Sequence, residues 1–159
     1  MEHPMKNVKI LWAIIVLQLL FLLIIGYKFI QGSVAPSEDE RTAVVLSKDE
    51  RNLILTEMRK FLISVQGVSE AITNGDMNLV AELATEAGMK AEENTPGSLL
   101  TKIPLPMKTL GFDTRNRFDQ ISADAIQLKD PLTSRKQLDQ LLNNCLACHA
   151  TYKLIEENK

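Results

Sequence analysis

The chain begins with a long apolar stretch. Between Ile10 and Tyr27 no residue is charged, and Gln18 is the only strongly polar one. An apolar helix of about 20 residues is needed to cross a bilayer. Residues 10–30 are therefore predicted to form a transmembrane helix, preceded by a short tail of residues 1–9.

This apolar stretch has a second interpretation, a cleaved signal peptide. Ser33-Val34-Ala35 resembles the small-x-small sequence at which such peptides are cut. The apolar stretch is longer than the core of about 7–15 residues that is usual in signal peptides. Pro36 would also follow the cut bond directly. We therefore expect a retained anchor.

Charges on either side of this helix predict its orientation. Lys6 and Lys9 precede it, and the acidic run 38–40 follows it. Lys28 opposes this pattern, but its side chain is long enough to reach the headgroups. By the positive-inside rule, the N-terminus is expected in the cytoplasm of a bacterium. Everything after Ile30 is then exported to the periplasm, anchored to the inner membrane by a single pass.

After a predicted tether, residues 31–46, the polar and apolar positions change to a helical period. Ser47 and Glu50 form the S-x-x-E pattern of a capping box, which begins a helix. Apolar residues then recur every three or four positions, as one helix face requires: Ile54, Met58, Phe61, Val65, Val68 and Ile72. Asn74-Gly75 is predicted to end this helix.

Three more helices follow by the same argument. Asp76 can cap a helix that continues to about Glu93, and a further helix is predicted over residues 107–128. Asp130-Pro131 can begin the last one, with proline in the first turn. The apolar face of the last helix carries Leu138, Leu141, Cys145, Cys148 and Tyr152. No strand-like alternation is evident, so the fold expected for residues 47–157 is an all-α antiparallel four-helix bundle, preceded by one transmembrane helix.

The strongest chemical signal is Cys145-Leu146-Ala147-Cys148-His149, a C-x-x-C-H sequence. Two thiols three positions apart on a helix point to nearly the same side, so both can bond to one haem, and the next residue supplies the axial imidazole. A thioredoxin-like pair would need a βαβ context that the chain lacks. A chance match is the other alternative. Because the cysteines continue the apolar face, haem is expected inside the bundle.

Charge excludes some other functions. The exported residues 31–159 hold 15 Lys and Arg and 19 Asp and Glu, a net charge of −4. Binding to nucleic acid is not expected from such a balance. We also find no nucleophile with a paired base and no glycine-rich phosphate loop, so an enzyme is not predicted.

The C-terminal sequence Cys148-His149-Ala150-Thr151-Tyr152-Lys153 resembles the cytochrome c-prime family, which are c-type cytochromes built as four-helix bundles. The likeness covers residues 47–156 in architecture, but it is close in sequence only at this motif. It implies thioether bonds at Cys145 and Cys148, His149 as proximal ligand, and Tyr152 and Lys153 packed near the proximal side. The membrane anchor departs from the family, whose members are mostly soluble.

The ligand on the other side of the iron would decide the function. His3, the only other histidine, lies in the predicted cytoplasmic tail. Met58 lies on the inner face of its helix, near the expected level of His149, and Met107 is the second choice. A vacant position is the alternative, with Met58 as an ordinary core residue. Arg115 and Arg117 could meet the haem propionates, although a surface role is favoured for both.

These inferences predict a membrane-anchored mono-haem cytochrome that carries electrons between membrane redox complexes or to another cytochrome. If the distal position is vacant, the protein would instead bind nitric oxide or carbon monoxide. A third alternative is an accessory haem subunit of a respiratory complex. The sequence leaves the oligomeric state open, a homodimer included.

Overall fold

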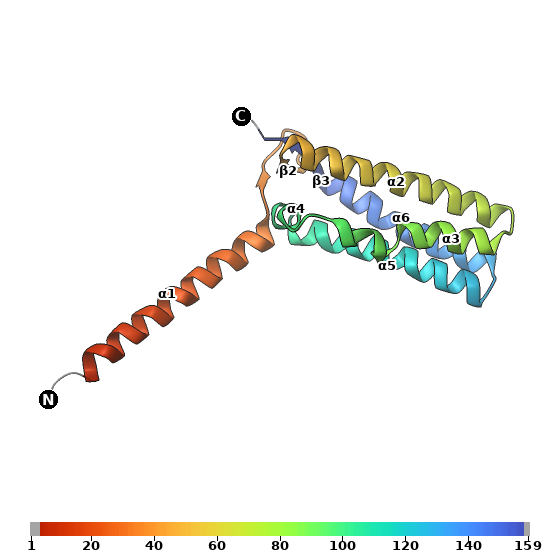
Figure 1. The fold of residues 1–159 in the computed structure, drawn as a ribbon. Coiled ribbons are helices and arrows are strands. Elements are labelled where there is room, and N and C mark those ends of the chain that lie inside the picture. Colours follow the sequence, from red (N-terminus) through yellow and green to blue (C-terminus); the bar gives the residue numbers. More distant parts are fainter. Residues whose placement is uncertain (1–3, 158–159) are drawn as a thin grey trace.

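A single long helix projects from a domain of packed helices (Figure 1). The computed structural model describes residues 4–157. Within them the α-helices are α1 (Pro4–Gln31), α2 (Lys48–Thr73), α3 (Met77–Ala87), α4 (Gly97–Lys102), α5 (Leu105–Gln127) and α6 (Pro131–Thr151). The remaining elements are a 3-10 helix, η1 (Met89–Asn94), and the short strands β1 (Val34–Ala35), β2 (Thr42–Leu46) and β3 (Tyr152–Glu156).

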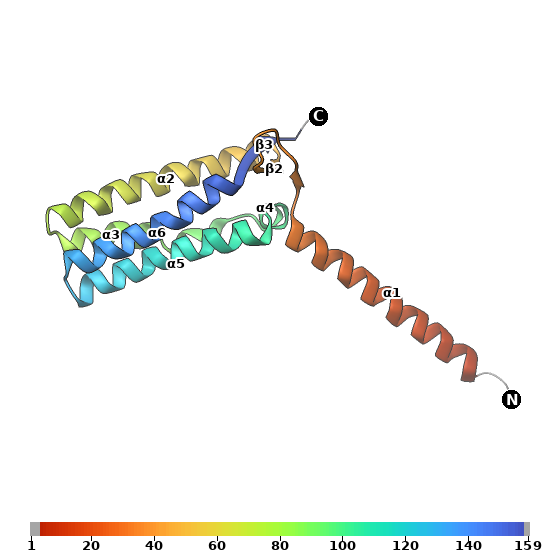
Figure 2. The same ribbon diagram turned by 180° about the vertical axis from the view of Figure 1, so that it is seen from behind.

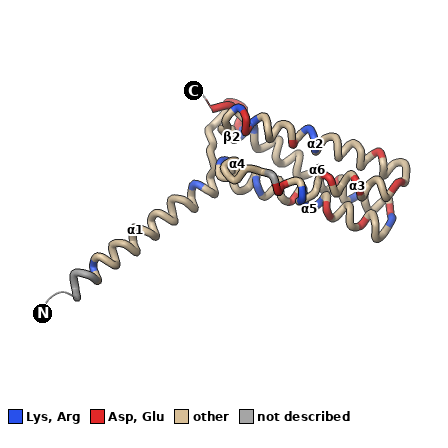
Figure 3. Tube along the Cα trace, in the orientation of Figure 1, with Lys and Arg blue, Asp and Glu red and all other residues tan. Residues whose placement is uncertain are grey.

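Helix α1 contains the predicted apolar segment, residues 10–30. Its part from Val8 to Gln31 is long and apolar enough to cross a membrane, and its most apolar stretch buries nothing against the rest of the chain. Between Lys9 and Lys28 it carries no charge, whereas charged residues are spread over the domain (Figure 3). The expectation of an apolar N-terminal helix is confirmed.

The capping residues read from the sequence begin the helices of the domain. The Ser47 hydroxyl accepts a hydrogen bond from the Glu50 backbone N–H at 3.3 Å, and the Glu50 carboxylate accepts one from the Ser47 N–H at 2.9 Å. Asp76 caps α3 in a similar way, and Asp130 caps α6. Each cap satisfies N–H groups that have no partner within the helix.

The core of the domain consists of two separate clusters. The larger cluster lies between α2, α3, α5 and α6 and includes the fully buried Phe118, whose ring stacks on Phe61 at 5.9 Å between centroids. The smaller cluster joins the sheet to α2, α4 and α5. It consists of Val44, Leu46, Ile54, Leu99 and Met107. Cys145 packs against the larger cluster and Cys148 against the smaller one, so the two cysteines connect them.

The second predicted helix is interrupted. It was expected to reach Glu93, but α3 ends at Ala87 and η1 follows. At the break, the backbone N–H of Met89 donates to the Asp119 carboxylate at 3.0 Å. A side chain at Gly88 would collide with that carboxylate, which explains a glycine here. The Asp119 side chain of α5 thus occupies the space beside Gly88, and α3 ends at this contact.

The sheet is the main departure from the all-helical expectation. Strand β2 pairs antiparallel with β1 and parallel with β3, with Val44 opposite Leu154. Residues 31–46, expected to be a tether, therefore fold onto the domain, and Ala43, Val44 and Leu46 are fully buried. Helix α6 ends at Thr151, because Tyr152 and its successors leave the helix to pair with β2.

Candidate functional site

A cavity of about 470 Å³ lies between α2, α5 and α6, next to the segment η1–α4. This volume falls in the usual range of small-molecule and cofactor sites, about 300–1,000 Å³. Most of its lining is apolar. Examples from different elements are Leu53, Phe61, Val65, Leu99, Ile103, Leu110 and Leu142. The cavity is therefore suited to a large, mostly apolar ligand.

All three residues of the C-x-x-C-H motif line this cavity. Cys145 and Cys148 are free and half-buried, on the face of α6 that points into the domain. Burial raises the pKa of both thiols, and the neighbouring Cys145 raises that of Cys148 further. His149 is exposed and contributes to the cavity from its edge. The motif thus brings two thiols and one imidazole to a single wall.

The position of His149 along α6 differs from the expectation. The helical bundle is expected to extend to residue 157, but α6 ends at Thr151, two residues after His149. The backbone carbonyl of His149 accepts a hydrogen bond from Arg41 Nη1 at 3.4 Å. The early end of α6 places His149 in the last helical turn, beside the segment that leads into β2.

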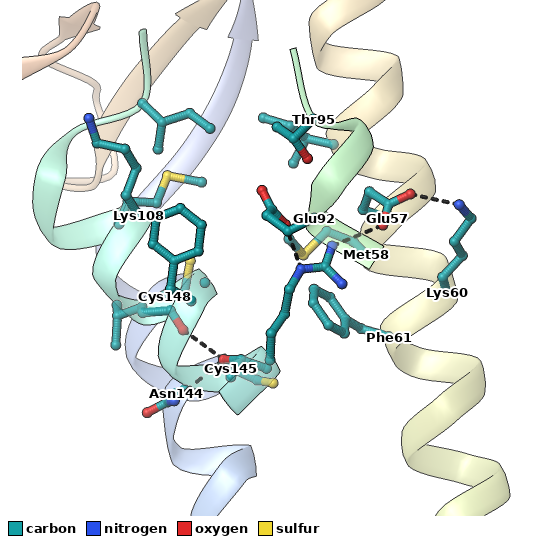
Figure 4. Close-up of a pocket in the computed structure, with 18 of the residues that line it drawn as sticks. Glu57, Met58, Lys60, Phe61, Glu92, Thr95, Lys108, Asn144, Cys145 and Cys148 are labelled. Carbon is teal, nitrogen blue, oxygen red and sulfur yellow. Dashed lines mark hydrogen bonds and ion pairs between the residues drawn. The ribbon is translucent and has the colours of Figure 1, made fainter. Parts of the chain in front are cut away.

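Two methionines predicted as alternative iron ligands also line the cavity. Met58 comes from α2 and is half-buried, and Met107 comes from the first turn of α5 and is buried. Figure 4 shows Met58 projecting from α2 toward the side from which Cys145 and Cys148 come. Met77 belongs instead to the larger core cluster, between α2, α3, α5 and α6. The structure therefore brings both candidate methionines and the motif to one cavity.

The polar part of the cavity wall is centred on Arg115. Its side chain is only 6% exposed and lies between two carboxylates, with Nη2 at 3.1 Å from Glu57 and Nε at 2.5 Å from Glu92. The guanidinium also donates to the carbonyl of Ala87 and lies 4.7 Å from the ring centroid of Phe61. The favoured surface role is therefore wrong for Arg115. Arg117, in contrast, pairs with Asp113 at the half-exposed surface.

The Arg115 network extends to solvent through Lys60 (Figure 4), whose ammonium lies 2.7 Å from the other oxygen of Glu57. Burial raises the pKa of Glu57, but hydrogen bonds from Lys60 and Arg115 outweigh it and leave the pKa below its ordinary value. Sequence reasoning missed Glu57 and Glu92. They meet Arg115 only because α2, η1 and α5 come together, and no local spacing signals that.

Tyr152 and Lys153, the last two predicted site residues, begin β3 rather than continue α6. Tyr152 packs against the smaller core cluster, and burial, together with Cys148, raises the pKa of its phenol. The Lys153 ammonium lies 3.2 Å from Asp39, which also pairs with Arg41 at 2.7 Å. Because Arg41 also donates to the His149 carbonyl, Lys153 is linked to His149 through Asp39 and Arg41.

Within residues 4–157, no group of three or more His, Cys, Asp or Glu side chains is arranged to hold a metal ion. The chemistry that the wall offers is instead that of two thiols, one imidazole and two thioethers around an apolar space. Comparisons with protein-family models, with curated proteins and with solved structures find no match for this chain.

Proposed function

We propose that this protein is a membrane-anchored c-type cytochrome with one haem, which carries electrons between membrane redox complexes. One observation carries the proposal. Cys145 and Cys148, the only two cysteines of the chain, and His149, which directly follows Cys148, all line a mostly apolar cavity of about 470 Å³. The residues fit the group, because the thiols are free and share the wall with the imidazole.

In this proposal, Cys145 and Cys148 would hold the cofactor by thioether bonds, and a ring nitrogen of His149 would bind its iron. When bound, haem would supply one-electron exchange at its iron. The apolar side chains from α2, α5 and α6 would exclude water from it. The Arg115 guanidinium already has two carboxylate partners. A propionate would therefore have to compete with Glu57 and Glu92 for this arginine.

The arrangement proposed for the cofactor domain is an antiparallel four-helix bundle of α2, α3, α5 and α6, with the small sheet at one end. Helix α2 contacts α3, α3 contacts α5, and α5 contacts α6. Helix α6 in turn contacts α2, which closes the ring of four helices. The view from behind shows these helices side by side, with α2 joined to α3 and α5 joined to α6 by short turns at the end far from α1 (Figure 2). This order supports the bundle topology.

The location proposed for the domain is the periplasmic side of a bacterial inner membrane, with the N-terminus in the cytoplasm. Lys6 and Lys9, which precede the apolar stretch near the start of α1, and the acidic residues after α1 support this orientation. Covalent haem is attached on that side of the membrane, so the topology and the motif agree.

The proposal is tested by extraction of the cofactor. The full chain is produced in a bacterium that can attach haem c, purified from membranes in detergent and treated with acidic acetone. We expect the haem to stay with the polypeptide on a denaturing gel, because thioether bonds survive these conditions. A protein with non-covalent haem serves as the control. Complete extraction of the haem would refute the assignment.

Met58 is the residue we propose as distal ligand. Replacement of Met58 by alanine should convert a low-spin spectrum to a high-spin one, abolish the red charge-transfer band of thioether-bound iron, and lower the reduction potential. The variant should also bind carbon monoxide readily. Met107→Ala is the matched control, because Met107 lines the same cavity. If the unchanged protein is already high-spin and binds carbon monoxide at once, Met58 is only a core residue and gas binding replaces electron transfer.

A further inference from the structure

The anchor and the domain are joined by direct contacts. The backbone N–H of Ser33 donates to the carbonyl of Lys102 at 2.7 Å. Gly32, just before it, has a φ of +69°, and a side chain there would come within 2.5 Å of the same carbonyl and 2.7 Å of the Pro104 nitrogen. Only glycine allows the chain to turn so close to this corner of the domain.

A buried lysine strengthens this joint. Lys108 in α5 is 6% exposed, and its ammonium donates to the carbonyls of Phe29 in α1 and Leu100 in α4, both at 3.0 Å. The same ammonium lies 3.5 Å from the ring centroid of Phe29. A positive charge is favourable at the C-terminal end of a helix, where carbonyls lack partners. Lys108 therefore binds α1, α4 and α5 together.

The surface beside this joint has a distinctive composition. We call residues 96–106, from Pro96 through α4 to the first turn of α5, the corner surface. Its more exposed residues include Ser98, Thr101, Leu105 and Pro106. No Asp or Glu occurs between Glu93 and Asp113, although the residues after α1 carry a net charge of −4. The corner surface contributes no carboxylate of its own and exposes Leu105, while its lysine, Lys102, is paired with Glu50 at 2.7 Å. Such a surface carries little net charge to repel anionic headgroups and an apolar side chain to reach the layer below them.

We propose that the corner surface rests on the headgroups of the bilayer that α1 crosses, and that the joint at Gly32 and Lys108 holds the domain in this one orientation. The corner surface is continuous with the end of the anchor, as Figure 1 shows for α4 and the start of α5. The inference rests on the proposed anchoring, but not on haem. Leu100 and Ile103 of the corner surface line the cavity, as does the adjacent Met107, so this docking would hold the cavity close to the membrane.

Photo-cross-linking to lipid tests this orientation. The photoreactive residue p-benzoylphenylalanine is introduced in place of one leucine at a time, in the full chain reconstituted in vesicles of phosphatidylcholine and phosphatidylglycerol. Leu105 probes the corner surface, Leu17 the anchor, and Leu132 the opposite end of the domain. Their exposed fractions are 38%, 69% and 60%, so all three are accessible. Lipid adducts are measured by mass spectrometry of the protein.

We expect adducts at positions 17 and 105, with several-fold fewer at position 132. Adducts at 17 but equally few at 105 and 132 would refute the docking and leave the anchor intact. An absence of adducts at 17 would refute the anchor, and the docking with it. Adducts at Thr101, probed in the same way, give a second reading of the corner surface should the change at Leu105 disturb folding.

The role of the joint is tested separately with Lys108→Met. Methionine fills similar space but cannot donate to the carbonyls of Phe29 and Leu100. We expect the adduct yield at 105 to fall several-fold, while the yield at 17 stays unchanged. An unchanged yield at 105 would show that the corner surface docks without Lys108. It would overturn the proposed role of Lys108 in holding the orientation of the domain.

Discussion

Replacing Cys145 and Cys148 together by alanine is expected to remove all covalently held haem from the protein. No other thiol exists in the chain to take over the attachment. The two cysteines also pack against the two different core clusters, so the variant loses contacts on both sides of the cavity. We therefore expect a complete loss of the haem stain on denaturing gels, together with a lower melting temperature by circular dichroism.

Leu146→Ala is the matched control for this experiment. Leu146 lies between the two cysteines on the same helical turn, but its side chain is 69% exposed. Its replacement should leave the covalent haem and the melting temperature nearly unchanged. Persistence of covalent haem in the double cysteine variant would contradict the attachment site. A single change, Cys145→Ala or Cys148→Ala, should leave one thioether and a shifted absorption spectrum.

Replacing Arg115 by methionine is expected to destabilise the domain by about 2–3 kcal/mol. Breaking a buried ion pair typically costs about 3–5 kcal/mol, because a charge is left without a partner. The value is lowered here since Glu57 and Glu92 keep 24% and 20% of their side chains exposed. Chemical denaturation of the full chain in detergent micelles measures the change. Arg117→Met, which breaks only a half-exposed pair with Asp113, should cost less than about 1 kcal/mol.

The pH dependence distinguishes loss of charge pairing from loss of packing. The folded-state pKa of Glu57 lies below the ordinary value of 4.5, so its pairing stabilises the unchanged protein above that pH and is lost as the pH falls through the lowered pKa. In the Arg115→Met variant the Glu57 carboxylate lacks the guanidinium, so this contribution to stability is missing above the lowered pKa of Glu57 and makes no difference once Glu57 is protonated. The deficit of the variant relative to the unchanged protein should therefore shrink at acidic pH. A deficit independent of pH would indicate packing alone.

The helices were predictable because their signals are local. Ser47, Asp76 and Asp130 begin α2, α3 and α6 through contacts with residues two or three positions on. The apolar period of three or four then identifies the buried faces, and residues such as Val68, Phe118 and Leu138 are buried. Such patterns lie within one helix and need no knowledge of the tertiary structure.

The sheet and the polar wall of the cavity depend on contacts between distant residues. Strand β2 is a short run, Thr42 to Leu46, whose β-branched residues fit a strand but were read as part of a tether. Its partner β3 lies more than a hundred positions later, so register and burial follow only from the folded chain. The sequence alone favours a surface role for Arg115. It is buried because Glu57 and Glu92 come to it from other elements.

The parallel pairing of β2 with β3 has a consequence for the order of events during synthesis. Residues 42–46 leave the ribosome early, but they obtain this partner only when residues 152–156 have also been made. The C-x-x-C-H sequence, residues 145–149, lies just before that late strand. Until β3 is in place, the end of α6 is not yet fastened to the rest of the domain. If Cys145 and Cys148 are the proposed attachment sites, both thiols would be most accessible before this strand pairing forms.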